Sequence, residues 1–195
     1  MGVSFQGVKP EWRARLLAAR AELPPDRLAR AAAAVTGHVV GRLSGAARVG
    51  AYVPIGTEPG SLALLDALRE GGTEVLLPVV GADGLSWGRY TGSAGLVPAR
   101  WGLREPAGPA VALAGADAVL VPALAVDRRG VRLGRGGGHY DRALPAAAGA
   151  VLVALLHDGE LVDRLPADPW DARVTAVVTP STGWTELPVV EHHGS

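Results

Sequence analysis

Apolar residues recur at helical spacing in the first part of the chain. From Glu11 to Leu23 they fall on one side of a helix, and Pro24-Pro25 ends that segment. A second, alanine-rich helix is predicted from about Asp26 to Leu43, with Gly45 following as a stop. The sequence therefore predicts two helices before the first strand.

After residue 47 the pattern changes to short apolar runs separated by turn residues, which is typical of buried strands. Between the first two runs, Ser61 can cap a helix that extends to about Glu70 and ends at Gly71-Gly72. This strand, helix, strand order indicates a βαβ unit and a parallel sheet. The predicted strands are Arg48–Pro54, Glu74–Leu77 closed by Pro78, Leu85–Tyr90, Ala116–Pro122, Val151–Leu156 and Ala176–Thr179.

These elements predict an α/β fold with an open, mostly parallel sheet flanked by helices. A short helix is expected near residues 139–144, and residues 92–110 are expected to be irregular. The chain of 195 residues can bury one sizeable core, so residues 1–195 are expected to form a single domain. Residues 118–121 are continuously apolar and predict a buried strand. Ligands of such sheets bind at the carboxyl ends of the strands, so the segment after this strand is a candidate site.

Composition narrows the class of protein. Hydrophobic residues make up 48% of the chain and charged residues 19%, as in globular and not disordered proteins. The formal net charge is zero and the pI is about 7.0, so we expect no nucleic-acid partner and no attraction to an anionic membrane. No apolar run approaches the roughly 20 residues that span a bilayer. We expect the protein to be a monomer.

The chain contains no cysteine. This excludes disulfides, thiolate nucleophiles and cysteine-ligated zinc, and it favours a cytoplasmic protein. Residues 1–11 lack a basic segment followed by an apolar run, so a signal peptide is not expected. Lys9 is the only lysine. It is either an ordinary solvated charge or an ammonium group retained for a phosphate oxygen, and the residue alone favours the former.

The candidate chemistry lies in residues 132–141, which read Arg-Leu-Gly-Arg-Gly-Gly-Gly-His-Tyr-Asp. Glycines let the backbone turn tightly and bring its N–H groups to an anion, and a helix that begins near His139 adds its positive end. Arg132 and Arg135 offer forked donors for phosphate oxygens. Asp141 can reach a Mg²⁺ that the same phosphates coordinate. Together these features predict a site for a metal-bound polyphosphate.

Two common phosphate motifs do not fit this loop. It is not a Walker A motif, because no Gly-Lys-Ser/Thr follows. It is not a dinucleotide fingerprint, because His139 stands where the third glycine is expected. A flexible surface turn with solvated arginines is the plain alternative. Three consecutive glycines cost backbone entropy on folding, which favours a functional role.

The segment from Arg132 to Arg142 resembles the signature of the 5-formyltetrahydrofolate cyclo-ligases, also called 5,10-methenyltetrahydrofolate synthetases. Other landmarks of this family follow in the same order over residues 9–184. They are Lys9 and Arg13, Tyr52-Val53-Pro54 with Glu58, the turn Gly102–Pro106, Leu165-Pro166, Trp170-Asp171 and Thr179-Pro180.

The resemblance implies an enzyme that uses ATP and Mg²⁺ to close 5-formyltetrahydrofolate to 5,10-methenyltetrahydrofolate, with release of ADP and phosphate. It also implies a three-layer α/β fold of the NagB-RpiA-CoA transferase-like type. The formyl oxygen would attack the γ-phosphate of ATP, and N10 would then close on the activated carbon. Such a reaction needs mainly positioning and charge stabilisation from the protein.

The resemblance also implies roles for residues of this chain. Arg135 and Asp141 would act in catalysis, and Asp141 and Asp171 would hold Mg²⁺. Val53 and Glu58 would contact the folate. The residues bordering the formyl group would be Arg135, Gly136, Gly137, Gly138 and His139. The ATP-binding residues would be Lys9, Arg13, Arg132, Leu133, Gly134, Arg135, Gly136, Gly137, Gly138, His139 and Tyr140.

Two positions depart from the pattern of the family. His139 stands where the first of two tyrosines is common, and Glu160 stands near a position that often holds Gln, in what would be the folate site. These departures leave open a non-catalytic nucleotide- and folate-binding relative. An enzyme acting on a sugar phosphate or CoA ester is a more distant alternative. The aromatic faces proposed for the pterin are Tyr52, Trp87 and Trp101.

Several of these residues also have plain structural readings. Without the resemblance, Asp171 would sooner cap a turn and Glu58 would sooner be a loop carboxylate. Trp12, near the start of the first helix, is expected in the core, and Glu105-Pro106 is read as structural.

Overall fold

The computed structural model describes residues 8–81, 84–168 and 170–188, and the first seven residues, considered above for a signal peptide, lie outside these ranges. The helices are α1 (Lys9–Ala21), α2 (Pro25–Arg42), α3 (Leu62–Glu70) and α4 (His139–Ala143), with the 3-10 helices η1 (Ser93–Gly95), η2 (Arg100–Gly102) and η3 (Leu144–Ala147). The strands are β1 (Arg48–Gly50), β2 (Glu74–Gly81), β3 (Gly84–Arg89), β4 (Leu96–Pro98), β5 (Arg104–Pro106), β6 (Ala110–Val111), β7 (Ala118–Pro122), β8 (Ala125–Asp127), β9 (Arg132–Leu133), β10 (Val151–Leu155), β11 (Leu161–Val162), β12 (Ala176–Thr179) and β13 (Gly183–Glu186).

A central sheet in the order β13-β12-β10-β7-β1-β2-β3-β6 organises the fold. The five strands from β12 to β2 are parallel to their neighbours, and the outer strands β13, β3 and β6 pair antiparallel. Two small sheets, β11-β8-β9 and β4-β5, accompany it. The predicted fold, a mostly parallel sheet flanked by helices, is confirmed.

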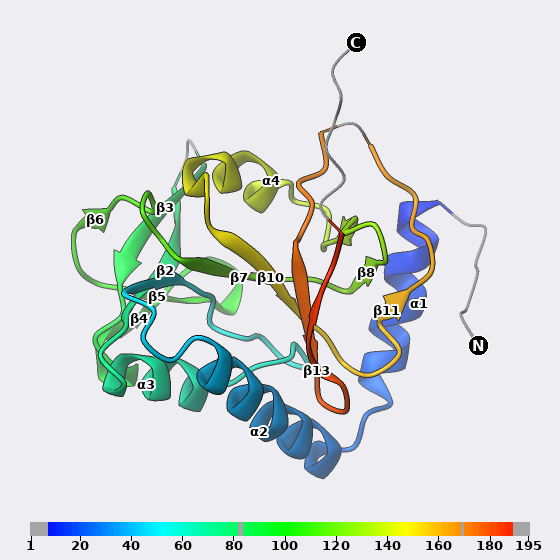
Figure 1. Cartoon of the computed structure of the whole chain (residues 1–195), viewed down its shortest axis with the longest axis horizontal. Coiled ribbons are helices and arrows are strands. Elements are labelled where there is room, and N and C mark those ends of the chain that lie inside the picture. The colour runs from blue at the N-terminus through cyan, green and yellow to red at the C-terminus, as the bar shows by residue number, and fades with distance from the viewer. Residues whose placement is uncertain (1–7, 82–83, 169, 189–195) are drawn as a thin grey trace.

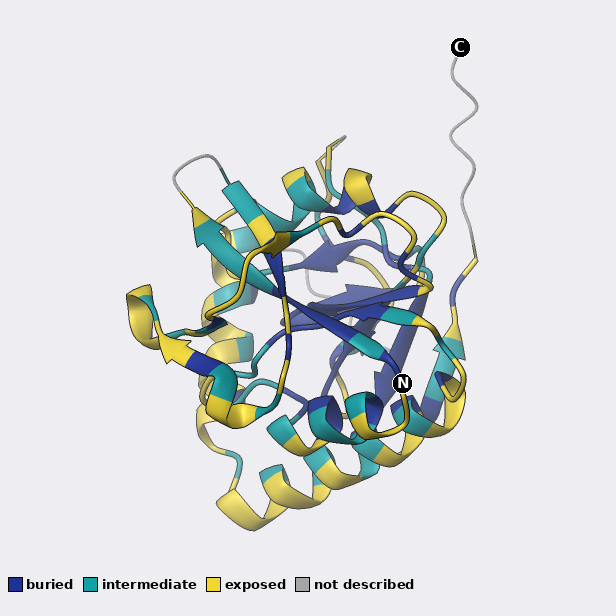
Figure 2. Cartoon of the chain, turned by 90° about the vertical axis from the view of Figure 1, so that its left-hand side faces the viewer, coloured by how far each residue is buried: buried dark blue, intermediate teal, exposed yellow. Residues whose placement is uncertain are grey.

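Helices cover both faces of the sheet (Figure 1). On one face, α2 and α3 pack with Val35, Val39 and Leu65 against the inner strands. On the other face, α4 and η3 contribute Tyr140 and Leu144 to a second apolar cluster that also holds Trp87. The strands between these layers are buried, while the outer sides of the helices are exposed (Figure 2). Of the helices described, none is both long and apolar enough to cross a membrane.

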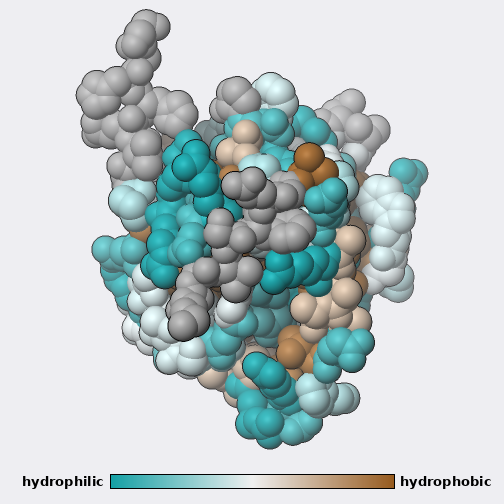
Figure 3. Space-filling model, turned by 90° about the vertical axis from the view of Figure 1, so that its right-hand side faces the viewer, coloured by the Kyte–Doolittle hydropathy of each residue, from teal (hydrophilic) through white to brown (hydrophobic). Residues whose placement is uncertain are grey.

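Helix α1 packs away from the central sheet, beside the small sheet that contains β8, β9 and β11 (Figure 1). Trp12 is buried there with Val131, Leu133 and Leu165, which confirms its expected core role. The molecular face that carries α1 is mostly hydrophilic, with apolar side chains in small separate areas (Figure 3). The contact with the small sheet places α1 next to the strand β9 that leads into the glycine-rich loop.

Local signals predicted the helices well. Both N-terminal helices are present; the boundaries of the first are shifted by two residues and those of the second by one, a normal uncertainty at helix ends. Ser61 caps α3 as predicted, because its hydroxyl oxygen accepts the N–H of Leu64 at 3.1 Å. The helix expected near residues 139–144 is also present, but α4 has only five residues before it tightens into η3.

Three strand predictions are corrected by the structure. Strand β1 ends at Gly50 and not at Pro54, because the chain leaves the ladder after Ala51. Strand β2 does not stop at Pro78: beyond Leu76 it pairs only with β3, so the missing N–H of Pro78 interrupts no ladder with β1. Residues 92–110 are not wholly irregular, since they include the short hairpin of β4 and β5 and the start of β6.

The order in which successive strands are added to the sheet reverses at β1 and β7, which are parallel neighbours. From β1 the chain adds β2 and β3 on one side, whereas β7, β10 and β12 follow on the other side. The carboxyl ends of β1 and β7 therefore diverge at a topological switch point, where open α/β sheets leave a crevice for ligands.

Candidate functional site

A pocket of about 650 Å³ opens at this switch point. Its floor comes from the segments that follow β1 and β7, and one wall is the loop from Gly134 to Gly138. Most of the residues that the sequence predicted for ATP, folate and metal line this pocket, and the exceptions are Trp87 and Glu160. Those that line it include Lys9, Arg13, Val53, Glu58, Arg132, Leu133, Gly134, Arg135, Gly136, Gly137, Gly138, His139, Tyr140, Asp141 and Asp171.

The loop needs glycine at two positions for conformational reasons. Gly136 has φ 104° and Gly138 has φ 63°, a region that side chains rarely adopt. A Cβ on Gly136 would also lie 3.3 Å from the guanidinium carbon of Arg13. The loop therefore turns sharply before α4 and lets the Arg13 side chain approach its backbone.

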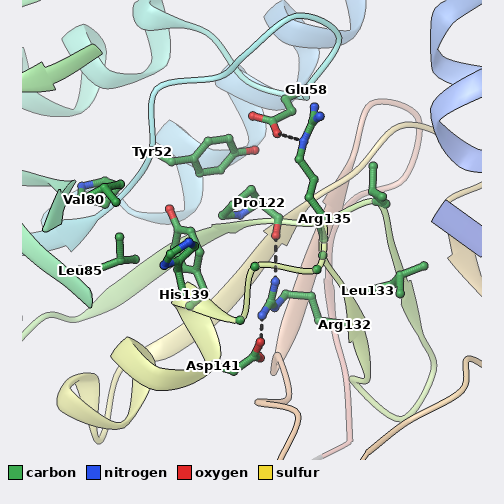
Figure 4. A pocket seen from close by; sticks show the side chains of 18 of the residues that line it. Tyr52, Glu58, Val80, Leu85, Pro122, Arg132, Leu133, Arg135, His139 and Asp141 are labelled. Atoms are coloured by element: carbon green, nitrogen blue, oxygen red, sulfur yellow. Dashed lines mark hydrogen bonds and ion pairs between the residues drawn. The ribbon is translucent and has the colours of Figure 1, made fainter. Parts of the chain in front are cut away.

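Arg132 lies beneath the loop, with its side chain 5% exposed. Its Nη2 donates to Oδ1 of Asp141 at 2.7 Å, and its Nη1 donates to the carbonyl of Pro122 at 3.3 Å (Figure 4). The guanidinium carbon also lies 5.9 Å from the centre of the Tyr140 ring. Arg132 thus joins the end of β7 to the start of α4 and holds Asp141 at the edge of the pocket.

Tyr140 is partly buried; its ring contacts the guanidinium of Arg132 and meets the ring of Trp87 edge-on at 6.4 Å. Burial raises the pKa of Tyr140, and the positive charge of Arg132 opposes this only in part. The phenol is therefore neutral at physiological pH.

Glu58 faces the loop from the opposite wall (Figure 4). Its side chain is 8% exposed, and Oε1 accepts a hydrogen bond from Nε of Arg135 at 3.0 Å. Oε2 accepts the N–H of Ile55 at 3.0 Å. The buried ring of Tyr52 lies to one side of the pair formed by Glu58 and Arg135 (Figure 4), and its hydroxyl donates to the carbonyl of Pro59 at 2.8 Å. Burial, and next the charge of Glu58, raise the pKa of Tyr52 well above its ordinary value.

Lys9 and Arg13 reach the pocket from α1. Nζ of Lys9 lies 2.5 Å from a carboxylate oxygen of Asp168 and 2.7 Å from one of Asp171. Partial burial lowers the pKa of Lys9, but the hydrogen bonds to both carboxylates outweigh it, so the net pKa is raised. Arg13 donates from Nε to the carbonyl of Gly134 at 2.9 Å. The spacing of four residues on one helix thus places both cations beside the loop.

Comparison with known proteins decides the family. The sequence profile of the 5-formyltetrahydrofolate cyclo-ligase family matches residues 6–180. A 5-formyltetrahydrofolate cyclo-ligase of Mycolicibacterium smegmatis is 47% identical over 189 residues, which cover 92% of this chain and 97% of the relative. This chain belongs to the 5-formyltetrahydrofolate cyclo-ligase family.

Other cyclo-ligases and a solved structure agree with this assignment. The 5-formyltetrahydrofolate cyclo-ligase of Escherichia coli K12 is 36% identical over 129 residues, covering 62% of this chain and 71% of the relative. The NMR structure of the Aquifex aeolicus 5,10-methenyltetrahydrofolate synthetase superposes with a TM-score of 0.77. It is 29% identical, and the match covers 95% of this chain and 97% of that one.

Two expectations about the pocket of this cyclo-ligase family member are corrected. Glu160 does not lie in the pocket lining but in the interior, where it forms an ion pair with Arg20 at 2.7 Å. Its departure from Gln is therefore matched by a buried cation. Trp87 also lies outside the lining, because its indole is buried in the core between the sheet and α4. Tyr52 and Trp101 do line the pocket, as expected.

The structure adds pocket residues that sequence reasoning missed. Asp168 shares Lys9 with Asp171, and the exposed ring of Trp170 stands beside them. On the opposite side, Val80 and Leu85 form an apolar wall (Figure 4). Val80 and Leu85 lie on a β-hairpin whose pocket-facing side only the tertiary pairing defines, so no local signal could have identified them.

In this site each of three cationic side chains faces a carboxylate: Lys9 pairs with Asp171, Arg132 with Asp141 and Arg135 with Glu58. Asp171 also accepts the N–H of Asp168 at 2.8 Å, so it has the turn-capping role considered from the sequence as well as a place in the pocket. Within the described ranges, no group of three or more His, Cys, Asp and Glu residues forms a metal site. The arrangement offers cations and backbone amides for an anion, and single carboxylates beside them.

Proposed function

We propose that this chain catalyses the ATP-dependent conversion of 5-formyltetrahydrofolate to 5,10-methenyltetrahydrofolate, with release of ADP and phosphate. The observation that carries the proposal is that the glycine-rich loop, Glu58 and the cationic side chains of Lys9, Arg13, Arg132 and Arg135 line one pocket. The chain is also 47% identical to a cyclo-ligase over almost its whole length.

The chemistry proceeds in two displacements. The formyl oxygen on N5 attacks the γ-phosphorus of ATP, an O–P bond forms, and the bond to the β-phosphate oxygen breaks to release ADP. The lone pair of N10 then attacks the formyl carbon and the C–O bond breaks, so that phosphate leaves with the formyl oxygen; the proton lost from N10 balances the step as the hydrogen of HPO4²⁻. Neither displacement needs a covalent bond to the protein, so catalysis depends on positioning and on charge stabilisation.

The polyphosphate is assigned to the side of the pocket formed by α1 and the loop from Arg132 to Tyr140. Lys9 and Arg13 neutralise phosphate charge from α1. Arg135 is exposed on the loop, where it can swing from Glu58 to the transferring phosphoryl group. The N–H groups of the glycines approach phosphate oxygens without interfering side chains.

The folate is assigned to the side formed by Val53, Glu58 and the hairpin of β2 and β3. Its flat pterin fits between apolar side chains such as Val80 and the ring of Tyr52. The buried carboxylate of Glu58 suits the N–H donors of a pterin, because an acceptor held at 8% exposure loses much hydration and gains from direct hydrogen bonds. His139 and the adjacent glycines border the formyl group in this arrangement.

Asp141 and Asp171 are assigned to Mg²⁺. Their carboxylate oxygens suit this cation, which usually takes only one or two protein carboxylates and completes its shell with phosphate oxygens and water. When bound, Mg²⁺ neutralises phosphate charge. The protein side chains hold the two carboxylates at the pocket: Arg132 donates to Asp141 and Lys9 to Asp171.

We further propose that residues 1–195 act as a single cyclo-ligase domain, as a monomer in the cytoplasm. The pocket draws its lining from α1 as well as from residues near 171, so nearly the whole chain contributes to one site. The absence of cysteine in the sequence is consistent with a reducing compartment.

The test is the near-ultraviolet absorbance of the methenyl-folate chromophore. We expect the band to grow from 5-formyltetrahydrofolate only when ATP and Mg²⁺ are both present. Binding of both ligands without the band would favour the non-catalytic relative. The non-catalytic alternative is based on the departures at His139 and Glu160. Glu160 does not support it, because Glu160 lies outside the pocket. Binding of a sugar phosphate without any folate binding would favour the other enzyme class.

A further inference from the structure

A buried ion pair lies at the far end of α1 from the pocket. Arg20 is 1% exposed and Glu160 is 6% exposed. Nε and Nη2 of Arg20 donate to Oε1 and Oε2 of Glu160, both at 2.7 Å, which is the forked geometry that fixes both side chains. Neither residue lines the pocket, and no step of the reaction proposed above uses them.

This ion pair links three chain segments that wall the pocket, two of them directly and the third through His157. Arg20 belongs to α1 and lies 7 and 11 residues after Arg13 and Lys9 (20 − 13 and 20 − 9), a spacing that puts all three on one helix face. Nη2 of Arg20 also donates to the carbonyl of Ala123 at 2.7 Å, in the pocket floor after β7.

The third segment is the loop that carries Glu58. Oε2 of Glu160 accepts the backbone N–H of His157 at 2.7 Å. The His157 ring is nearly buried, and its Nε2 lies 2.8 Å from the carbonyl of Thr57, to which it donates because a carbonyl can only accept. Thr57 directly precedes Glu58, so one chain of hydrogen bonds runs from α1 to the opposite wall of the pocket.

We propose that Arg20 and Glu160 are positioning residues of the active site. Through α1 they set where Lys9 and Arg13 stand beside the glycine-rich loop, and through His157 and Thr57 they hold the loop of Glu58. The identity of the two ligands rests on the proposed function. The geometry does not depend on which ligands bind: one buried pair fixes the distance between the nucleotide wall and the folate wall.

Two sets of variants separate the effect of the ion pair on Lys9 and Arg13 from its effect on the loop of Glu58. Arg20→Met combined with Glu160→Gln removes both charges together but keeps an acceptor oxygen for the N–H of His157. This double variant should raise KM for ATP on the order of tenfold or more, because small displacements of binding groups are costly, and should leave KM for the folate within about twofold. His157→Phe removes the bond to Thr57 and should show the reverse pattern.

The matched control is the ion pair of Arg48 and Glu74, which joins β1 to β2 away from the pocket. Arg48→Met with Glu74→Gln removes two charges in the same way and should leave both KM values unchanged. Arg20→Lys with Glu160 retained keeps the charges and loses the fork. Its KM for ATP should lie between those of the wild type and the double variant. This single variant replaces the double variant in the test if the double variant does not fold.

Calorimetry with Mg-ATP in the absence of folate gives a readout that does not depend on turnover. We expect the Kd for Mg-ATP of the Arg20/Glu160 variants to rise by the same factor as their KM for ATP. A lowered Tm with unchanged KM and unchanged Mg-ATP binding would reduce the pair to a purely structural role and overturn the proposal.

Failure of the proposed function gives a different pattern, because the wild type itself would then neither bind Mg-ATP nor form the methenyl band. In that case amide hydrogen exchange still tests the geometry. Faster exchange of the amides of residues 11–13 in the double variant than in the Arg48/Glu74 control supports the positioning role, and equal exchange overturns it.

Discussion

Arg135 donates a hydrogen bond from Nε to Oε1 of Glu58 at 3.0 Å, across the pocket between the glycine-rich loop and the loop after β1. The Arg135 side chain is half exposed, whereas the Glu58 side chain is 8% exposed. The residue assigned to phosphate is therefore paired, before ligands bind, with the residue assigned to folate. Binding of the two substrates should exchange this ion pair for contacts with each ligand.

Glu58→Gln tests that relationship. The amide keeps the shape of the side chain, but it loses the charge that attracts the N–H groups of a pterin and holds Arg135. We expect KM for 5-formyltetrahydrofolate to rise about ten- to a hundredfold, as for loss of a charged hydrogen bond. KM for ATP should stay the same or fall, because Arg135 is released. An equal rise in both KM values would show that Glu58 only supports the fold.

Asp141→Asn tests the carboxylate assigned to Mg²⁺. An Asn oxygen can still accept from Arg132, but the substitution removes its counter-ion, so the free energy of unfolding should fall by about 1.5–3 kcal/mol. The kcat/KM for Mg-ATP should fall about a hundredfold, measured with Mg²⁺ titrated at fixed ATP. Asp26→Asn, in an exposed i,i+4 pair on α2, is the control and should change neither quantity. An unchanged dependence on Mg-ATP would remove Asp141 from the metal site.

Asp127→Asn tests the support of the glycine-rich loop. Asp127 is fully buried, and its oxygens accept from the backbone of Arg129, Val131 and Leu165 and from the Arg129 side chain. It thus ties the turn before β9 to the segment that leads to Asp171. Loss of this charge should lower the free energy of unfolding by about 3–5 kcal/mol.

Urea denaturation measures that loss. Asp163→Asn breaks an exposed pair with Arg128 and should cost less than about 1 kcal/mol. Similar losses in the two variants would mean that the network around Asp127 adds little to stability.

Stability should fall in acid through Glu74. Hydrogen bonds from Arg48, and then the charges of Arg48 and Arg89, lower the pKa of Glu74 despite its partial burial. Because the unfolded carboxyl binds its proton at higher pH, the stabilising contribution is complete above the unfolded pKa of about 4.3 and is lost as the pH falls through the lower folded pKa.

Unfolding free energies of the wild type and of Glu74→Gln between about pH 3 and pH 7 measure this contribution. The difference between them should shrink as the pH falls. A difference that is constant with pH would show that the charge of Glu74 contributes nothing to stability.

The sequence predicted the fold where local rules decide it. The spacing of apolar residues gave α1 and α2, and Ser61 gave the start of α3. The length of β2 could not be predicted, because pairing with β3 overrides the usual effect of Pro78. The hairpin of β4 and β5 was missed because its strands have three residues each and Trp101 turns the chain in the left-handed region.

The candidate site was predictable as a set of residues but not as a set of contacts. The glycines and arginines among residues 132–141 indicate an anion-binding site from the sequence alone. The partner of Glu160 is 140 residues away in the sequence, so nothing near Glu160 indicated that it would be buried with Arg20 and not placed at the folate. The pairing of Lys9 with Asp168 and Asp171 likewise depends on how α1 docks.

Calorimetric titration of Mg-ATP into the purified chain, with Arg135→Met beside the wild type, tests directly whether the pocket binds a nucleotide. We expect saturable binding by the wild type at one site and binding weakened about tenfold or more in the variant, because a guanidinium contact to phosphate is lost. No measurable affinity of the wild type for Mg-ATP would contradict the assignment of the pocket to a nucleotide, and the proposed reaction with it.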